Sequence, residues 1–234
     1  MVGMPAKTRR MRQTNKILNY VLFTLLAGVL ILTGLIVYSV LFEKPVPKSP
    51  EEQEYFLALD LVRKNPNNSY YLQRLAEAQF DLGKYREAAE SYKKAIKLAP
   101  YRPMLHYGLG LCYLKLGDKK NALKEFQEEL KVTGNMNELA WYQIGLLYKE
   151  QKKYEDAEKA FQWALKRAPA LADVHFDLAK MYAEWGKLEL ARKEALETLR
   201  YDPTNDEAKA FLADIEAKLK LRGSKEKETT RTSK

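Results

Sequence analysis

The chain contains very few of the residues that build metal centres, disulfide frameworks and catalytic relays. Its 234 residues include one cysteine, Cys112, and two histidines, His106 and His175. A single cysteine excludes an internal disulfide, and so few thiols and imidazoles exclude a cysteine-based zinc site, an iron–sulfur cluster or a histidine-rich metal centre. We therefore expect no cofactor and no metal, and we interpret Cys112 as a small, semi-buried apolar residue.

Recognisable catalytic motifs are also missing. The sequence has no phosphate-binding G-x-x-x-x-G-K-[ST] loop, no G-x-S-x-G nucleophile turn, no H-E-x-x-H zinc motif and no calcium-binding loop. The two histidines lie 69 positions apart with no cysteine or carboxylate cluster in the pattern around them. We expect a protein that is not an enzyme and that has no small-molecule substrate.

Charged residues are absent from one long stretch. Residues 17–42 contain no Asp, Glu, Lys or Arg over 26 positions and are mostly apolar. A helix of that length measures about 39 Å and crosses a hydrocarbon core about 30 Å thick. The run is longer than the apolar region of a signal peptide, and no small-residue cleavage pattern follows it. We expect an uncleaved transmembrane helix over residues 17–42 that contacts the lipid bilayer.

The net charge of +9 comes from the two ends of the chain. Residues 1–16 hold five basic residues and no acidic one, residues 217–234 hold seven basic and two acidic, and residues 43–216 hold 28 basic and 29 acidic. A nucleic-acid-binding domain normally carries its basic excess on the fold itself, so we expect no nucleic-acid partner. Only Lys44 and Lys48 closely follow the apolar stretch, and this asymmetry predicts a cytoplasmic N-terminus over residues 1–16, with the rest of the chain outside the cytoplasm.

Helical spacing continues after the apolar stretch. Residues 43–50 contain three prolines and predict a semi-rigid linker. From Glu51 onward the apolar residues follow a helical period, interrupted by Gly, Pro and Asn, and no strand pattern appears. We expect an all-α fold that starts with a flanking helix over residues 51–66.

A 34-residue repeat organises the rest of the chain. Pro66, Pro100, Pro169 and Pro203 are separated by 34, 69 and 34 residues, and each proline ends a helix because it cannot continue the hydrogen-bond ladder. A unit that begins at Glu138 has pattern residues at positions 4, 7, 8, 11, 20, 24, 27 and 32. These are Trp141, Ile144, Gly145, Tyr148, Ala157, Phe161, Ala164 and Pro169. We expect Trp141 to be a buried core residue.

This pattern resembles the tetratricopeptide repeat. Four units keep its register, at residues 69–102, 103–137, 138–171 and 172–205. The residues that depart from it are Gln79 in the first unit, His106, Glu129 and Gly134 in the second, and His175, Ala195 and Thr198 in the fourth. The resemblance implies an α-solenoid of about four helix-turn-helix repeats over residues 69–205. We expect a capping helix over residues 206–222, ended by Gly223, and a disordered basic tail over residues 223–234.

The resemblance also implies a groove. In this family the first helix of each unit exposes positions 2, 5, 9, 12 and 13 on a concave surface. The groove residues carried over are Tyr70, Gln73, Phe80, Tyr107, Leu111, Leu114, Leu139, Tyr142, Leu146, Phe176 and Lys180. Exposed aromatic and aliphatic side chains of this kind indicate a binding site for a protein partner, as an apolar helix or extended segment. The alternative is that the rings pack against neighbouring units or against a terminal helix.

One binding mode of the family is absent. Chaperone-binding members hold a terminal carboxylate with Lys, Arg and Asn residues, and the matching positions here are Gln73, Glu77, Gly108, Leu139 and Gln143. The sequence therefore favours a single-pass, membrane-anchored interaction module that scaffolds or chaperones the assembly of cell-envelope proteins. It resembles bacterial assembly factors for secretion, pili, outer-layer components or c-type cytochromes. Two alternatives stay open: a cytoplasm-facing adaptor similar to mitochondrial import receptors, and a regulatory subunit that recruits a membrane enzyme.

Overall fold

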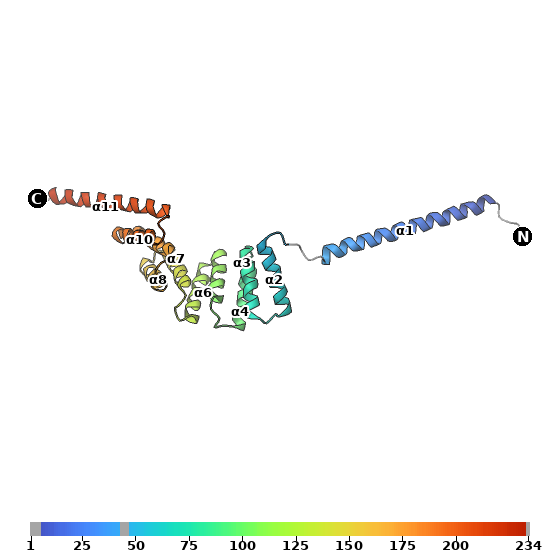
Figure 1. The fold of residues 1–234 in the computed structure, drawn as a ribbon, viewed down its shortest axis with the longest axis horizontal. Coiled ribbons are helices and arrows are strands. Elements are labelled where there is room, and N and C mark those ends of the chain that lie inside the picture. The colour runs from blue at the N-terminus through green and yellow to red at the C-terminus, as the bar shows by residue number, and fades with distance from the viewer. Residues whose placement is uncertain (1–5, 43–46, 233–234) are drawn as a thin grey trace. The chain divides into compact units, whose positions relative to one another are not determined.

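The computed structural model describes the backbone of residues 6–42 and 47–232, and the side chains of residues 18–38 and 47–224. The chain forms two compact units, residues 1–48 and residues 49–234, and we call the second the repeat domain. The described elements are all helices (Figure 1). The predicted all-α fold is confirmed.

The first unit contains a single long helix, α1 (Ala6–Phe42). Within it, the 21 residues Leu18–Tyr38 are apolar and long enough to cross a membrane, although a signal sequence meets the same criterion. The large side chains of this span are exposed, as at Leu22 (63%) and Leu30 (65%). Its two threonines, Thr24 and Thr33, donate their hydroxyls to the carbonyls of Val21 and Leu30, which satisfies these groups inside the helix. The predicted basic flank, residues 1–16, and Lys44 lie outside the residues with described side chains.

Helix α2 (Pro50–Lys64) begins the repeat domain. Ser49 caps it by accepting a hydrogen bond from the Glu52 amide at 3.2 Å, and Pro50 occupies the first helical turn. Proline is favoured there because that position needs no amide donor. Pro50 is therefore part of the helix rather than the end of the linker, and the helix ends two residues before Pro66.

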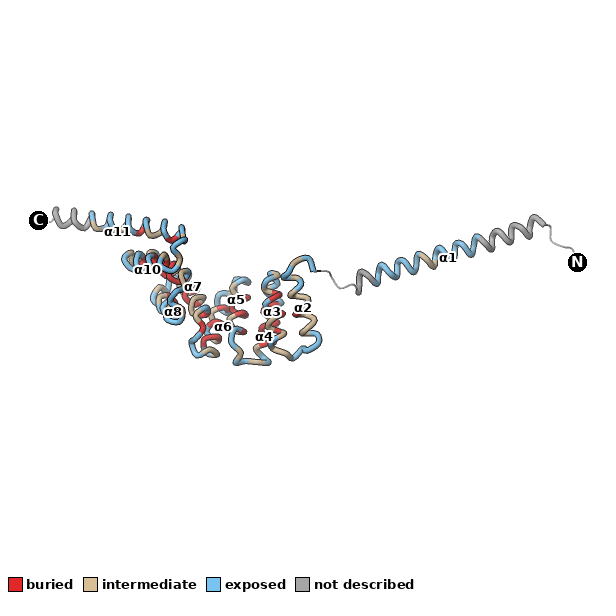
Figure 2. The backbone as a smooth tube through the Cα atoms, in the orientation of Figure 1, coloured by how far each residue is buried: buried red, intermediate tan, exposed pale blue. Residues whose placement is uncertain are grey.

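Four antiparallel helix pairs follow, and each helix packs against the next one along the chain. The pairs are α3 (Ser69–Asp81) with α4 (Tyr85–Leu98), α5 (Leu105–Lys115) with α6 (Lys119–Val132), α7 (Glu138–Glu150) with α8 (Tyr154–Arg167), and α9 (Ala172–Glu184) with α10 (Leu188–Tyr201). Figure 2 shows that buried residues gather on these pairs. We call the pairs units one to four.

A glycine and a phenylalanine explain the close approach of the two helices in units two and three. A Cβ on Gly145 would lie 2.7 Å from ring carbons of Phe161, and one on Gly110 would lie 2.6 Å from Phe126. Both phenylalanines are completely buried. The small residue at position 8 and the large ring at position 24 therefore fill the same space, and neither can change size alone.

Trp141 differs from the expectation. Its side chain is only half-buried, and its ring stacks on the 41%-exposed Trp163 at 5.7 Å. The indole Nε1 donates to the Asn135 carbonyl at 3.2 Å. Trp141 therefore has an apolar face that stacks on Trp163 and a polar edge that is bonded to a loop carbonyl, which is typical of a half-buried indole. The buried core is built instead around rings such as Phe126 and Phe161.

The departures from the pattern in unit two have a structural cause. Met104, just before α5, has a positive φ of 72° and supplies no side-chain cap. The completely buried Glu129 supplies it from α6: its carboxylate accepts hydrogen bonds from the Met104 amide (2.8 Å) and the Tyr107 amide (3.2 Å). Asn137, the cap of α7, donates its side-chain amide to the same carboxylate at 3.1 Å. Glu129 thus joins the starts of two helices.

The final helix, α11 (Asp206–Thr232), is longer than predicted. It packs against α10, and Ile215 is completely buried. Gly223 does not end the helix, because its φ is not positive and it remains in the helical conformation. The Lys- and Glu-rich residues beyond it favour helix once the preceding turns are fixed. The prediction of a disordered segment from residue 223 is therefore wrong up to Thr232.

Cys112 is completely buried, which is more than expected. Burial raises the pKa of its thiol to about 12. The reactive thiolate is therefore almost absent at neutral pH. We expect Cys112 in the native protein to resist a thiol-specific reagent such as Ellman's reagent, and to react fully in denaturant. Rapid labelling of the native protein, followed by absorbance, would contradict this burial.

Candidate binding groove

The eleven predicted groove residues lie on the first helices of the four units, which we call the groove face (α3, α5, α7 and α9). Neighbouring first helices contact one another directly, α3 with α5 and α7 with α9. Tyr70 and Leu139 are exposed, and Phe176 is buried. The half-buried residues are Gln73, Phe80, Tyr107, Leu111, Leu114, Tyr142, Leu146 and Lys180. The groove face therefore combines open and covered positions.

Its second half, at units three and four, is closed by the chain's own side chains. Phe176 is only 5% exposed and meets Phe211 of α11 edge-on at 5.6 Å. Lys180 lies 4.1 Å above the Phe176 ring. The expectation that Phe176 offers a free aromatic surface is therefore wrong, because the final helix covers it. This is the alternative arrangement that the sequence left open.

Tyr142 is also engaged within the fold. Its hydroxyl donates to Asp177 Oδ2 at 2.6 Å, and burial together with this hydrogen bond raises its pKa above the ordinary value. Two lysines, Lys149 and Lys180, approach the other oxygen of Asp177 at 3.4 and 3.5 Å. Asp177 occupies position 6, which is not among the positions from which the groove residues were predicted, so the sequence pattern did not indicate this network. The network neutralises the acid and links units three and four.

The first half of the groove face stays open. Between α3 and α5 there is a pocket of about 390 Å³. It is lined by Glu77, Phe80, Asp81, Tyr92, Met104, Tyr107, Gly108 and Leu111. Three predicted groove residues, Phe80, Tyr107 and Leu111, meet here. Glu77, Asp81 and Met104 lie at groove positions of the family, whereas only the structure shows that the ring of Tyr92 completes the wall.

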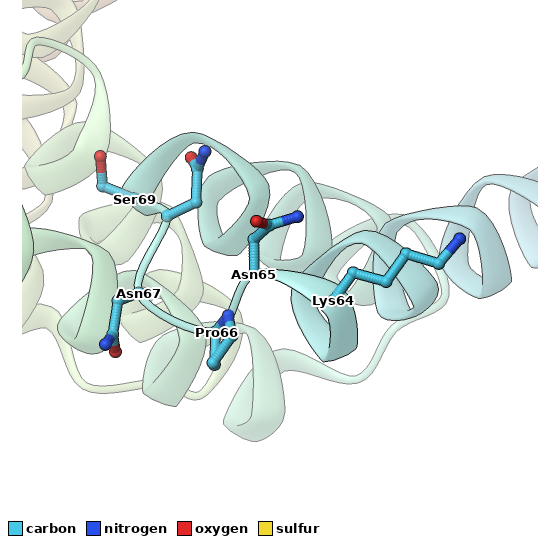
Figure 3. Close-up of a pocket in the computed structure, with 6 residues that line it drawn as sticks. Lys64, Asn65, Pro66, Asn67 and Ser69 are labelled. Atoms are coloured by element: carbon cyan, nitrogen blue, oxygen red, sulfur yellow. The ribbon is translucent and has the colours of Figure 1, made fainter.

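Two other hollows lack such a combination. The larger, about 530 Å³, surrounds the turn between α2 and α3, where Figure 3 shows Lys64, Asn65, Pro66, Asn67 and Ser69. Its neighbour Asn68 already caps α3 by accepting from the Tyr70 and Tyr71 amides. A shallow hollow of about 180 Å³ lies beside Trp163 on α8. Among the residues with described side chains, no group of His, Cys, Asp and Glu is arranged to hold a metal ion.

Both histidines lie within hydrogen-bond distance of a glutamate of their own unit. His106 Nδ1 lies 2.7 Å from Glu125 Oε2, and His175 Nδ1 lies 2.7 Å from Glu194 Oε2. His175 Nε2 also lies 3.0 Å from the Pro169 carbonyl. Both ring nitrogens of His175 thus face acceptors, and only the protonated imidazolium can donate to both. Burial lowers the pKa of His175, but the hydrogen bonds to Glu194 and Pro169 outweigh it and raise the pKa overall.

This geometry predicts a pH dependence of stability. Because the folded-state pKa of His175 is raised, its contribution is complete below the unfolded-state pKa of about 6.5 and is lost as the pH rises through the folded-state value. We expect the wild-type repeat domain to lose unfolding free energy above about pH 6.5, relative to a His175→Phe variant. Urea titrations of both proteins from pH 5 to 9 measure the difference. If the unfolding free energies of the two proteins change with pH in the same way, a protonated His175 does not stabilise the fold.

Comparisons with known proteins agree with this geometry. Two family models described as tetratricopeptide repeat match residues 74–134 and 139–171. The chain is 28% identical over 149 residues to BBSome complex member BBS4 of Bos taurus, covering 64% of this chain and 28% of that protein. It is 28% identical over 165 residues to DnaJ homolog subfamily C member 7 of Homo sapiens, covering 66% and 33%. The chain thus spans about a third or less of the length of these relatives.

Solved structures show the same fold. MamA from Desulfovibrio magneticus RS-1 superposes with a TM-score of 0.60 at 23% identity, over 68% of this chain and 89% of that one. YrrB, described as a TPR protein with an unusual peptide-binding site, gives a TM-score of 0.56 at 20% identity over 68% and 81%. Members with this solenoid are typically non-enzymatic scaffolds that bind protein partners. This chain contains tetratricopeptide repeats over residues 74–134 and 139–171, arranged in the helical pairs of that family's solenoid fold.

Proposed function

We propose that this protein is a single-pass, membrane-anchored interaction module without enzymatic activity, which holds protein partners during the assembly of cell-envelope components. The observation that carries the proposal is the open, apolar first half of the groove face, in a chain that also has an exposed apolar span. The chain's own final helix covers Phe176 but does not reach the pocket around Tyr107. An open apolar surface on an otherwise self-covered solenoid favours binding of another protein.

The proposed anchor is the span Leu18–Tyr38. Its large apolar side chains are exposed. Burial of about 20 such residues in a bilayer stabilises a spanning helix. We expect the full-length chain to stay in membranes washed at high pH and to keep the mass of residues 1–234. Release at high pH, or loss of the N-terminal mass, would show a cleaved signal sequence instead.

The proposed orientation places residues 1–16 in the cytoplasm and the repeat domain outside it. Because Cys112 is buried, an introduced cysteine is the only accessible thiol in the native chain. A Ser224→Cys variant should react with a membrane-impermeant maleimide in intact cells, whereas a Thr8→Cys variant should react only after permeabilisation. The reverse pattern would support the cytoplasm-facing adaptor.

Partner binding is tested at Tyr107, since this residue lines the open pocket. Tyr142 and Phe176 are unsuitable for the test because both are held inside the fold. A photo-reactive amino acid in place of Tyr107 should form a protein adduct in native membranes. The matched control replaces the half-exposed Leu196 of α10, outside the groove face. Equal adducts from both positions, or none from 107, would contradict a groove-bound partner.

A further inference from the structure

The pocket between α3 and α5 has an apolar interior and an acidic rim. Phe80, Tyr107 and Leu111 are half-buried and line it together with the exposed Met104. Glu77 and Asp81 also line it, and both are exposed. They are four residues apart on α3, so they lie on the same side of that helix, one turn from each other.

Neither acid forms an ion pair among the described side chains, although Arg74, one turn before Glu77, interacts with it electrostatically. No described lysine, arginine or histidine lies within ion-pair distance of Glu77 or Asp81, and the contact of Glu77 is a hydrogen bond accepted from Gln73 at 2.9 Å. Another acid on the groove face, Asp177, differs because Lys149, Lys180 and the Tyr142 hydroxyl surround it. The carboxylates of Glu77 and Asp81 lie one turn apart and repel each other. A cation bound between them relieves that repulsion.

The floor of the pocket adds a polar group. The Tyr92 ring is 95% buried and packs against Gly108, where a Cβ would lie 2.5 Å from the Tyr92 hydroxyl oxygen. No described residue hydrogen-bonds to this hydroxyl, and burial together with the charges of Glu77 and Asp81 raises its pKa, so it is a protonated donor. Because Gly108 has no Cβ, the Tyr92 phenol packs directly against it at the edge of the pocket. The floor therefore has a free hydroxyl for a ligand carbonyl or other acceptor.

We propose that this pocket binds a partner segment in which an apolar side chain lies next to lysine or arginine. The inference rests on the proposed function and specifies its partner. The apolar side chain enters between Phe80, Tyr107 and Leu111, while the neighbouring cation lies between Glu77 and Asp81. A pocket of about 390 Å³ accommodates a side chain of the size of leucine or phenylalanine. An acidic segment is disfavoured because it would place like charges against the rim.

The test uses the full-length protein in nanodiscs of zwitterionic phosphatidylcholine. Three fluorescein-labelled 11-residue peptides of glycine and serine carry a central Arg-Phe-Arg, Glu-Phe-Glu or Arg-Gly-Arg, and binding is followed by anisotropy. We expect Arg-Phe-Arg to bind at least tenfold more tightly than the other two. Binding should weaken with added salt, because exposed charges are screened.

Two variants with the same change in charge locate the site. Glu77→Gln with Asp81→Asn should weaken Arg-Phe-Arg binding about tenfold, which corresponds to about 1.4 kcal/mol. Asp173→Asn with Glu184→Gln removes two exposed acids from unit four and should leave binding unchanged. Thermal unfolding should be unaltered in the first variant, since its acids form no ion pair in the fold. Equal loss in both variants, no loss in the first, or binding of Arg-Gly-Arg as tight as Arg-Phe-Arg would overturn the inference.

The two proposals can fail separately. If the adduct from position 107 survives Glu77→Gln with Asp81→Asn unchanged, the groove binds a partner of other chemistry and this inference is overturned while the proposed function stands. If position 107 gives no adduct, the proposed function fails. If deletion of residues 223–234 strengthens Arg-Phe-Arg binding by tenfold, the chain's own basic end competes for the pocket. That result would overturn the inference that the pocket binds a segment of a separate partner protein.

Discussion

Replacing Phe161 with alanine is expected to lower the free energy of unfolding of the repeat domain by about 3–5 kcal/mol. Phe161 is completely buried and belongs to a cluster that also contains Ala157, Val174 and Leu178. Gly145 leaves no Cβ to fill the space that the lost ring would occupy. The cavity therefore persists, and its cost adds to the lost burial of the ring.

Thermal unfolding of residues 49–234, followed by circular dichroism, measures this effect. A loss of about 3–5 kcal/mol lowers the Tm of a domain of this size by about 6–20 °C. The matched control is Trp163→Ala, which removes a larger ring that is 41% exposed and stacked on Trp141. We expect the control to cost no more than about 1.5 kcal/mol. If the control proves as costly as Phe161→Ala, the assignment of the buried core is wrong.

Replacing Glu129 with alanine is expected to cost about 2–4 kcal/mol, although it restores the alanine that units one and three have at this position. The substitution leaves the amides of Met104 and Tyr107 and the side-chain amide of Asn137 without their acceptor. Buried donors without partners cost more than the packing of one small residue returns. The repeat pattern and the structure thus predict opposite signs.

Urea unfolding of Glu129→Ala and Glu129→Gln distinguishes these expectations. Glutamine keeps a side-chain oxygen near the start of α5, so it should cost less than alanine, about 1–2 kcal/mol. We expect the order of stability to be wild type, then glutamine, then alanine. An alanine variant as stable as the wild type would show that the pattern residue suffices at position 27 and that α5 needs no cap from α6.

The sequence predicted the repeat architecture well because its packing is local and periodic. Gly145 and Phe161 lie 16 residues apart and meet inside one unit, so their spacing alone indicates the contact. The caps at Asn68 and Asn137 follow from the same logic, since an asparagine precedes each first helix. Such a pairing recurs between units, as Gly110 with Phe126 in unit two and Gly145 with Phe161 in unit three, which makes it visible without an alignment.

Contacts that do not repeat were not predictable in this way. Glu129 is conspicuous only as a departure from the pattern, and the sequence does not show that its carboxylate reaches back to α5. Trp141 matches the family at position 4 but stacks on Trp163, a residue outside the pattern. The extension of α11 to Thr232 runs through Gly223, and composition alone does not determine whether this glycine ends the helix.

The candidate groove was predictable in part for the same reason. Family positions correctly brought Phe80, Tyr107 and Leu111 to neighbouring first helices, where they line one pocket. They did not show that Phe176 is covered by Phe211 or that Tyr142 is bound to Asp177, because both contacts involve residues at non-groove positions. That Glu77 and Asp81 form no ion pair with a described side chain is visible only in the structure, because the sequence does not show where the nearby basic residues lie.

Photo-crosslinking from position 107 of the full-length chain in its native membranes most directly tests the claim that an anchored groove holds a protein partner. The pocket geometry predicts one discrete protein adduct from position 107, its loss in the Glu77→Gln with Asp81→Asn variant, and none from position 196. Crosslinks of equal strength from positions 107 and 196, or an absence of adducts at 107 in membranes that retain the chain, would contradict the claim.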